Sequence, residues 1–419
     1  MILVFETNWT GTVHAPGNSA TIQVIAQAFP GQTVRVHAAA DHLAELRRDP
    51  AFTALAFVET VAVAVPAQHP GRLHLVSARR FWGEFALLRA ALKRVPGAEP
   101  VLVMLLSATS TAIFAAAWAV RLAGRRRRAP AAVQIGLHGN LNDALGWRSR
   151  NPLRRRFDLA AALAAPPAGL RFLVLEEAIR DAMRRFAPLA AARTDVLPLP
   201  VNPGEAAAIA PSPLAAPVPS PLAAPAPTSL AAPLRIGFVG TATAAKGIDV
   251  FLDLARRLGA RFGGRIAFHL VGRALPGGDP ARFAALAEPV GTAQLPRAEF
   301  LRRLARLHYV LLPYQPGYYD LSASGALLDA VTWGKPVIAL RVPIAAAMFA
   351  AADQPIGVLC DDAAGLEEAV ADIATHMDAD RYAREVAAVE RLRAARQPAA
   401  LAARYAALVR AGFPELALP

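Results

Sequence analysis

Short apolar runs alternate with longer stretches of helical character along most of the chain. Such runs are typical of buried strands, and their alternation with helices indicates parallel sheets covered on both faces. In the first half we expect strands at 2–5, 33–37, 61–65, 73–76, 101–106, 133–137 and 172–175, with helices at 19–28, 81–93, 111–123, 154–164 and 177–187. In the second half we expect strands at 235–239, 266–271, 309–312, 336–340 and 356–359. The pattern predicts an α/β fold with two Rossmann-like, doubly wound domains facing across a cleft.

A stretch rich in alanine, proline and serine interrupts this alternation near the middle of the chain. Residues 204–233 hold eight prolines and repeat the sequence SPLAAP. Proline at this density prevents helix and sheet, so we expect a semi-rigid spacer or a disordered loop. The prediction is an N-terminal domain over 1–203, this linker, and a C-terminal domain over 234–380. A helical segment over 381–419 would then pack back on the first domain.

One uncharged stretch, residues 101–120, has the length of a membrane span. Its centre reads Ser-Ala-Thr-Ser-Thr at 107–111, which indicates a strand end, a loop and a helix cap. We therefore interpret the stretch as a strand at 101–106 and a helix at 111–123. The residues at 1–6 are too few, and lack the basic region, for a signal peptide. These patterns predict a cytoplasmic protein.

The composition excludes a disordered chain and places most of the charge in the first half. Hydrophobic residues form 55% of the chain and charged residues 18%. The single cysteine, Cys360, excludes an internal disulfide and a multi-cysteine metal site. The net charge is +13, and ten arginines fall between Arg121 and Arg156. Such a patch attracts anionic lipid, a lipid pyrophosphate or nucleic acid, although an ordinary solvated surface is the alternative.

Two segments of the second half carry the features of an anion site. The polar loop Ser322-Ala-Ser324-Gly325 begins a helical run, and the first N–H groups of a helix lack internal partners and attract anions. Asp329 follows Gly325 by four residues and lies on the same side. Lys246 ends a loop between a strand and a helix. Because such loops converge at the carboxyl ends of parallel strands, the two segments predict a diphosphate seat beside a carboxylate.

On these residues the chain resembles glycosyltransferases of the GT-B fold, nearest the retaining family 4 group. The segment 240–247 lies where that family has Gly-Arg-Leu, three residues and Lys-Gly, and 329–336 lies where it has Glu-Ala-Met-Ala-x-Gly-x-Pro. The similarity is clearest over 234–375. Two positions depart from the pattern: the family's phosphate-binding arginine falls on Thr241, and the first of its two glutamates falls on Leu321.

The resemblance implies a hexosyltransferase that moves a sugar from a nucleoside diphosphate sugar to a hydroxyl of a saccharide or lipid-linked saccharide. It further implies retention of the anomeric configuration, in envelope, exopolysaccharide or glycolipid synthesis. Lys246 and His138 are the implied catalytic residues, since His138 follows the strand at 133–137 where the family has a histidine that faces the donor sugar. The other implied donor contacts are Gly17 and Asn18 in the first loop, then Gly240, Thr241, Ser322, Ser324, Gly325 and Asp329.

Each assignment has a plain structural alternative. Lys246 could be a surface lysine, Asp329 an exposed helical acid, His138 a loop histidine, and Gly17-Asn18 a helix cap. Two other functions also stay open. One is a non-catalytic GT-B-like partner that binds a nucleotide or saccharide, suggested by Thr241 and Leu321; the other is a nucleotide-sugar epimerase.

The sequence predicts neither a metal nor another cofactor, because the nine histidines form no helical i, i+4 ligand set. Nucleic-acid binding is disfavoured, because no basic stretch with interleaved aromatic residues is present. The basic segment 121–156 instead predicts peripheral contact with an anionic membrane surface at its inner face.

Overall fold

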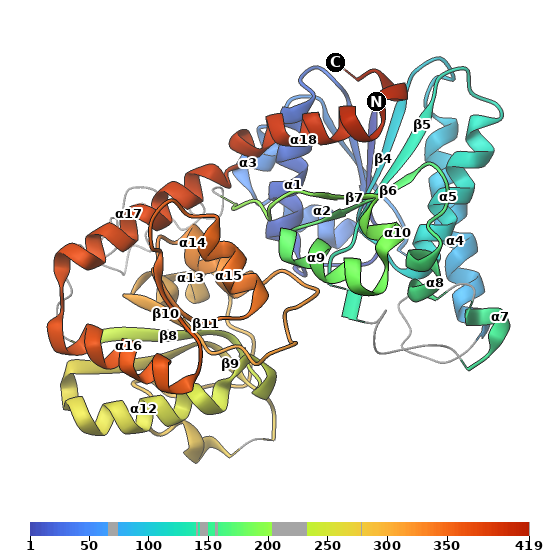
Figure 1. Ribbon diagram of the computed structural model, residues 1–419. Coiled ribbons are helices and arrows are strands. Elements are labelled where there is room, and N and C mark those ends of the chain that lie inside the picture. Colours follow the sequence, from blue (N-terminus) through green and yellow to red (C-terminus); the bar gives the residue numbers. More distant parts are fainter. Residues whose placement is uncertain are drawn as a thin grey trace. The chain divides into compact units, whose positions relative to one another are not determined.

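The computed structural model describes residues 1–65, 74–139, 141–142, 150–155, 158–202, 233–277 and 279–418. The chain forms two compact units, each a sheet with flanking helices (Figure 1). Among the described residues, the first unit takes in 1–202, 321–323 and 396–418, and the second takes in the rest. The predicted α/β class is confirmed. The expected linker at 204–233 lies, except for Pro233, outside the described residues.

The first unit is built on a seven-stranded sheet whose neighbouring strands pair in parallel. Across the sheet the strands are β3 (Val58–Ala62), β2 (Val34–Ala38), β1 (Ile2–Glu6), β4 (Val101–Ser107), β5 (Ala131–Gly136), β6 (Leu170–Val174) and β7 (Thr194–Val196). β1 and β4 are buried along their whole length, as expected for strands covered on both faces. The chain order reverses between them, which makes their carboxyl ends the switch point where such folds bind ligands.

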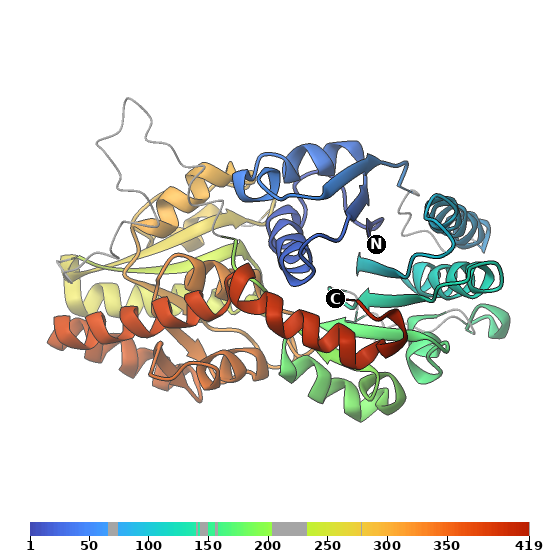
Figure 2. The ribbon, with the colours of Figure 1, turned by 90° about the horizontal axis from the view of Figure 1, so that it is seen from above.

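Helices cover both faces of this first sheet (Figures 1 and 2). One core packs under α4 (His74–Lys93), α5 (Ser110–Gly124), α8 (Leu159–Ala164), α9 (Glu177–Phe186) and α10 (Pro188–Ala191). The other packs under α1 (Ala15–Ala28), α2 (Ala40–Leu46), α3 (Pro50–Thr53) and α18 (Pro398–Gly412). The short helix α7 (Pro152–Arg155) and the 3₁₀ turn η4 (Pro414–Leu416) complete the unit. Tyr405 of α18 donates its hydroxyl to Gln134 Oε1 at 2.8 Å, which fixes this helix to β5.

The second unit contains a five-stranded parallel sheet. Its strands, in spatial order, are β12 (Gly357–Cys360), β11 (Val337–Leu340), β10 (Tyr309–Leu312), β8 (Leu234–Ala242) and β9 (Ile266–Ala274). Here the order reverses between β8 and β10. By the same rule, the loops that follow these two strands are where a ligand is expected.

The helices of the second unit follow the strands in alternation. They are α12 (Ile248–Phe262), α13 (Arg297–Ala305), α14 (Gly325–Thr332), α15 (Pro343–Ala350), α16 (Ala363–His376) and α17 (Ala379–Ala395), with 3₁₀ turns η1 (Ala244–Lys246), η2 (Gly263–Arg265) and η3 (Pro280–Phe283). Phe251 of α12 packs its ring between those of Phe238 and Phe268, with centroids 5.5 and 5.6 Å away. α17 belongs to the second unit and α18, which begins after Gln397, to the first.

Three local predictions are wrong. Of the strand expected at 73–76, the described residues 74–76 are the beginning of α4, because a short apolar run does not by itself distinguish a strand from a helix. α1 begins at Ala15 rather than at residue 19, since proline is tolerated in the first turn of a helix. Gly17 and Asn18 therefore lie on the helix and not in the loop. Finally, β8 extends through Gly240 and Thr241 to Ala242, because it stays paired with β9 to that point.

The uncharged stretch at 101–120 is a strand and a helix, as predicted. β4 ends at Ser107, and the Thr109 side chain caps α5 by accepting a hydrogen bond from the Ala112 N–H at 3.3 Å. Within the described part of the chain, no helix combines the length and the apolar character needed to cross a membrane.

Candidate functional site

The loops after β8 and β10 meet tightly at the switch point of the second sheet. In the turn η1, the Thr243 hydroxyl accepts a hydrogen bond from the Lys246 N–H at 3.3 Å. Gly247 follows with φ +78°, and a Cβ at this position would lie 1.8 Å from the carbonyl oxygen of Pro313. Only glycine permits this backbone and this approach. The loop that carries Lys246 is thus seated directly on the loop that follows β10.

The Lys246 side chain turns back over the end of β8. Its Nζ would lie 3.0 Å from a Cβ placed on Gly240, whose own φ is +104°. Burial lowers the pKa of the Lys246 ammonium, and the Asp329 carboxylate raises it. The structure therefore brings Lys246 and Asp329 into the same electrostatic environment, although they come from different strand–helix connections.

The N-terminus of α14 lies in the same unit and has an open position at Gly325. Ser324 is the cap: its Oγ accepts a hydrogen bond from the Leu327 N–H at 3.1 Å and lies 2.7 Å from the Tyr314 hydroxyl. The Ser324 hydroxyl is buried and caps the helix. Gly325 is exposed, and a Cβ there would have no atom within 4 Å. The backbone amides that begin α14, rather than the Ser324 hydroxyl, are thus available to an anion.

The other serine of the predicted loop is not assembled with this terminus. Ser322 belongs to the segment 321–323, which groups with the first unit. Its neighbour Leu321 is 1% exposed and lies in the apolar core. The position where the resemblance places a first carboxylate is therefore occupied by a buried hydrocarbon side chain.

Asp329, one turn into α14, forms an ion pair with an arginine that was not predicted from the sequence. Arg297, the first residue of α13, donates from Nη2 to Asp329 Oδ1 at 2.8 Å. The guanidinium of Arg297 also lies over the ring of Phe300, 4.9 Å from its centroid. The Asp329 side chain keeps 20% of its surface exposed. It is a partly accessible carboxylate with a fixed direction.

A second arginine that was not predicted from the sequence, Arg273, lies beside Thr241. β8 and β9 pair in register, so that Gly240 lies opposite Gly272 and Thr241 opposite Arg273. A Cβ on Gly272 would lie 1.9 Å from the Gly240 carbonyl oxygen, so the glycine allows the strands to continue side by side. Arg273 Nε donates to Thr241 Oγ1 at 3.4 Å. A guanidinium therefore reaches the position where the resemblance expects one, but from the neighbouring strand.

In the first unit, His138 follows β5 and pairs with another histidine. Its Nε2 lies 2.9 Å from Nδ1 of His14, and the two rings meet edge to face. Burial, and then the neighbouring His14, lower the pKa of His138 to about 3. The pair is therefore neutral near pH 7. His14 has φ +57° and lies 4.9 Å, ring to ring, from Trp9. His138 Nδ1 and Trp9 Nε1 are buried, and neither has a hydrogen-bond partner among the residues that the structure describes.

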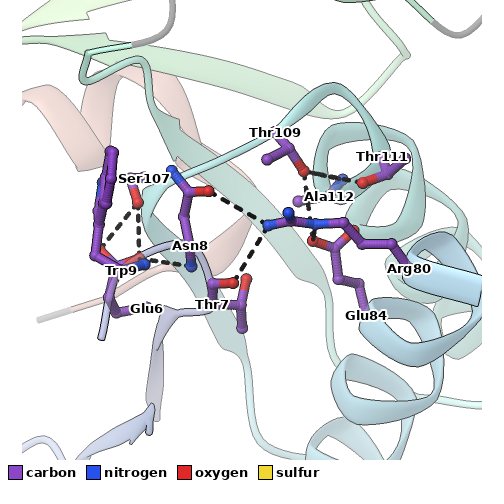
Figure 3. Close-up of polar contacts among 10 residues, drawn as sticks. All are labelled: Glu6, Thr7, Asn8, Trp9, Arg80, Glu84, Ser107, Thr109, Thr111 and Ala112. Carbon is purple, nitrogen blue, oxygen red and sulfur yellow. Dashed lines mark hydrogen bonds and ion pairs between the residues drawn. The ribbon is translucent and has the colours of Figure 1, made fainter. Parts of the chain in front are cut away.

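A buried carboxylate, Glu6, organises the loop that carries Trp9 and His14 (Figure 3). Glu6 ends β1 and accepts hydrogen bonds from the N–H groups of Asn8 and Trp9 at 2.8 and 3.1 Å. The Ser107 hydroxyl donates to it at 2.7 Å from the end of β4. Burial raises the pKa of Glu6, and these donors lower it. A network of this kind holds the loop after β1 in one conformation.

Asn18 is part of the same network. Its Nδ2 donates to Glu6 Oε2 at 3.1 Å and lies 3.1 Å from His42 Nε2. The other ring nitrogen of His42 donates to the Gly11 carbonyl oxygen at 2.8 Å. Asn18 therefore touches the loop through Glu6 and His42. Its neighbour Gly17 accepts a hydrogen bond on its carbonyl from the Thr21 hydroxyl, within α1.

A second polar group extends this network to α4 (Figure 3). Arg80 pairs its Nε with Glu84 Oε1 at 3.0 Å and points Nη2 at the Thr7 carbonyl oxygen and at Asn8 Oδ1, 3.4 and 3.3 Å away. Glu84 is 1% exposed, and burial raises its pKa. The Thr109 hydroxyl also faces Glu84, at 3.4 Å. The i, i+4 spacing of Arg80 and Glu84 was a visible signal for this pair.

The comparisons with known proteins agree with this architecture. Residues 233–376 match the sequence profile of the family described as "Glycosyl transferases group 1". A comparison with curated protein sequences gives no match.

Several solved structures are similar over nearly the whole chain. A glycosyltransferase from Rickettsia africae has a TM-score of 0.62 at 12% identity, covering 100% of this chain and 99% of its own. Sucrose-phosphate synthase from Thermosynechococcus elongatus has a TM-score of 0.61 at 17% identity, covering 99% of both chains. The Anabaena HepE protein has a TM-score of 0.58 at 15% identity, covering 98% of this chain and 99% of its own. The chain therefore has the GT-B fold of these structures, and its residues 233–376 are similar to the group 1 glycosyl transferases.

Proposed function

We propose that this enzyme transfers a sugar from a nucleoside diphosphate sugar to an acceptor hydroxyl, with retention at the anomeric carbon. The observation that carries the proposal is the arrangement at the second switch point, where Lys246 Nζ lies over Gly240 beside the loop after β10. The open Gly325 position at the start of α14 belongs to the same unit. A diphosphate leaving group needs fixed positive charge as the glycosidic bond breaks, and these groups supply it.

Protein groups, and not a metal, neutralise the diphosphate in this proposal. Lys246 contributes an ammonium whose pKa is lowered by burial but which Asp329 helps to keep charged. Arg273, beside Thr241, contributes the second cation. The backbone amides of Gly325 and its successor complete the seat, because the positive end of the helix dipole favours an anion.

Asp329 binds the ribose hydroxyls. Arg297 contacts its Oδ1 at 2.8 Å, which leaves Oδ2 to accept from a hydroxyl. In this proposal His138 contacts the donor sugar as a neutral imidazole. Its Nδ1 has no partner among the described residues, and a buried unpaired nitrogen is stabilised when a ligand hydroxyl bonds to it.

Nucleotide binding is tested first, because a nucleoside diphosphate reports on the donor site without any transfer of a sugar. HepE is described in complex with UDP, and a similar trehalose-phosphate synthase from Burkholderia vietnamiensis is described as UDP-forming. Thermal-shift screening against UDP, GDP, ADP and TDP should give a clear stabilisation with one of them. At a hundred times the dissociation constant, a ligand adds about 2.7 kcal/mol to the folded state.

Calorimetric titration of variants then tests the seat. Lys246→Ala should weaken nucleotide binding roughly 10- to 150-fold, the effect of losing one charge-assisted contact. Arg256→Ala is the matched control, because Arg256 is a cation of the same unit, 74% exposed on α12. If Lys246→Ala binds as tightly as wild type, the proposed seat is wrong.

A non-catalytic binding protein is the second candidate, and the burial of Leu321 favours it, since this side chain cannot contact a donor through a charge. Donor turnover distinguishes the two. Release of nucleoside diphosphate from a panel of sugar nucleotides and acceptors indicates an enzyme, and proton NMR of the new anomeric signal reports retention. Nucleotide binding without turnover across the whole panel would favour the binding protein.

We place the acceptor at the inner face of a membrane, as a lipid-linked saccharide of envelope, exopolysaccharide or glycolipid synthesis. The arginines of 121–156 support this, and among the described ones Arg121, Arg125, Arg126 and Arg128 are exposed. Electrostatic attraction to anionic lipid falls with salt. Binding to anionic vesicles should therefore weaken from 50 to 500 mM salt; binding wholly independent of salt would exclude this attraction.

A further inference from the structure

An aromatic cluster stands on the outer side of two neighbouring helices of the first unit. α4 and α5 lie side by side in both ribbon views (Figures 1 and 2). Phe81 is at the centre, with ring centroids 5.2 Å from Trp82, 6.2 Å from Phe85 and 5.9 Å from Trp118. We call these four residues the aromatic face. It joins the two helices through their side chains.

Both tryptophans of the aromatic face are largely exposed. Trp82 and Trp118 each keep 58% of their surface accessible, whereas Trp333 of the second unit keeps 8%. An aromatic side chain presents 150–250 Å² when fully free, so the two expose roughly 100 Å² each. Apolar surface gathered in one place, unlike single scattered residues, marks an interaction site.

The segment that carries the aromatic face is mostly basic. Residues 74–128 contain ten lysines and arginines and two acids, Glu84 and Glu99. Glu84 is buried against Arg80, and Glu99 lies 3.0 Å from the N-terminal ammonium of Met1. Glu84 is therefore shielded from solvent, whereas Glu99 keeps 35% of its side chain exposed. The charge that this part of the chain presents to solvent is positive.

The basic residues continue the stripes on which the tryptophans lie. Lys93 follows Trp82 by eleven residues and Arg125 follows Trp118 by seven, spacings that return to nearly the same side of a helix. Lys93 and Arg125 are exposed. Each helix thus presents a tryptophan and, two to three turns further on, a cation. Tryptophan and lysine or arginine on one side of a helix are a combination found where proteins contact lipid headgroups.

The opposite side of α4 faces the polar network described above. Arg80 and Glu84, which flank Trp82 along the helix, point to Thr7 and Asn8 and to Thr109 (Figure 3). α4 therefore separates the aromatic face from the switch point of the first sheet. A surface bound at the aromatic face would lie one helix away from this switch point.

We propose that the aromatic face docks on an anionic lipid bilayer, with Trp82 and Trp118 inserted at the level of the headgroups and the neighbouring cations on lipid phosphates. A segment with a large excess of cations complements an anionic surface, and exposed indole rings are stabilised at the boundary of hydrocarbon and water. This goes beyond the electrostatic attraction of 121–156, because inserted rings provide binding that salt does not remove. It does not depend on the glycosyl transfer.

Vesicle sedimentation of the full chain tests the proposal. Wild type, Trp82→Ala/Trp118→Ala and the control Leu189→Ala are mixed with vesicles of phosphatidylcholine with 30% phosphatidylglycerol and of pure phosphatidylcholine, at 50 and 500 mM salt. Leu189 is a matched control, because it is an apolar residue of the same unit that is 61% exposed. Circular dichroism and the nucleotide-induced thermal shift verify that each variant is folded. The shift also reports the donor site separately.

Wild type and Leu189→Ala should bind the anionic vesicles at both salt concentrations, more weakly at 500 mM. The double tryptophan variant should lose at least tenfold in partition coefficient, most evidently at 500 mM. Brominated lipids should quench tryptophan fluorescence in wild type and not in the double variant. Equal partition of wild type and double variant would overturn the proposal. So would a wild-type dimer in light scattering that dissociates in the double variant while no protein binds vesicles, because the face would then join two copies.

Discussion

Lys335 leads to a prediction about pH that concerns the support of the donor site. It follows α14 and is 2% exposed. Its Nζ donates to the carbonyl oxygens of Ala305 and Leu307 at 2.6 and 2.9 Å. Burial, and then Arg235, lower the pKa of Lys335 to about 7, against the upward effect of Glu390. A neutral amine keeps two hydrogens, so it can donate to both carbonyls without a charge.

The sign of the effect on stability follows from the two states. In the unfolded chain the pKa of this lysine is at its usual 10.5. Between pH 7 and 10.5 the unfolded chain therefore binds a proton that the folded chain lacks, and the free energy of unfolding rises with pH. Below pH 7 the folded state carries the full penalty of a buried charge. One pKa unit corresponds to about 1.4 kcal/mol, so this group adds roughly 2 to 3 kcal/mol between pH 7.5 and 9.5.

Urea unfolding of wild type, Lys335→Met and Lys93→Met at pH 7.5, 8.5 and 9.5 measures this contribution. Lys93 is the control, an exposed lysine of the first unit. Lys335→Met leaves both carbonyls without their donor, and its stability should rise by roughly 2 to 3 kcal/mol less than that of wild type over the range. Lys93→Met should follow wild type. If Lys335→Met rises as steeply as wild type, the buried-lysine reasoning fails.

Three further predictions concern the donor site itself. Gly247→Ala should destabilise the second unit by at least about 2 kcal/mol in urea unfolding, because its Cβ would meet the Pro313 carbonyl oxygen in a left-handed backbone; an unchanged midpoint would contradict the packing. Arg273→Ala should weaken nucleotide binding about tenfold or more in calorimetry, and adding Thr241→Arg to this variant should restore part of the affinity. If Thr241→Arg restores no affinity, the assignment of Arg273 as a phosphate-binding cation is refuted. Ser324→Ala should lower the free energy of unfolding by roughly 2 to 4 kcal/mol, because the helix loses its cap and the buried Tyr314 hydroxyl loses its partner. The nucleotide affinity of the folded variant should change little. A loss of affinity without a loss of stability would instead make the Ser324 hydroxyl a ligand contact.

Much of the fold was predictable because a buried strand of a parallel sheet needs a run of consecutive apolar residues, which is visible in the sequence. β1, β4 and β10 each contain a continuous apolar run, and burial on both faces requires that pattern. The run at 73–76 shows the limit. It has four residues, as β10 has, but one of them is His74, and the structure places residues 74–76 at the beginning of α4. Short runs are decided by what packs on them.

The site residues of one continuous strand–loop–helix segment were predictable from the sequence. The contacts between residues of two neighbouring strands were not. Lys246 lies at a loop end that the sequence marks with a following glycine. Arg273 is near Thr241 only because β8 and β9 pair in one register. Ser324 was predicted for a ligand, but its hydroxyl caps α14 and meets Tyr314, a contact that depends on where the preceding loop runs.

The sequence by itself determined the alternation of strands and helices, the sign of the charge and the residues that end two buried strands. Tertiary structure decided which side chains meet: Arg297 with Asp329, His14 with His138, and Arg80 with the loop after β1. The physical reason is that apolar periodicity depends on near neighbours in the chain, whereas hydrogen bonds and ion pairs are short-ranged in space. Their partners are fixed only when the sheet has set the order and register of its strands.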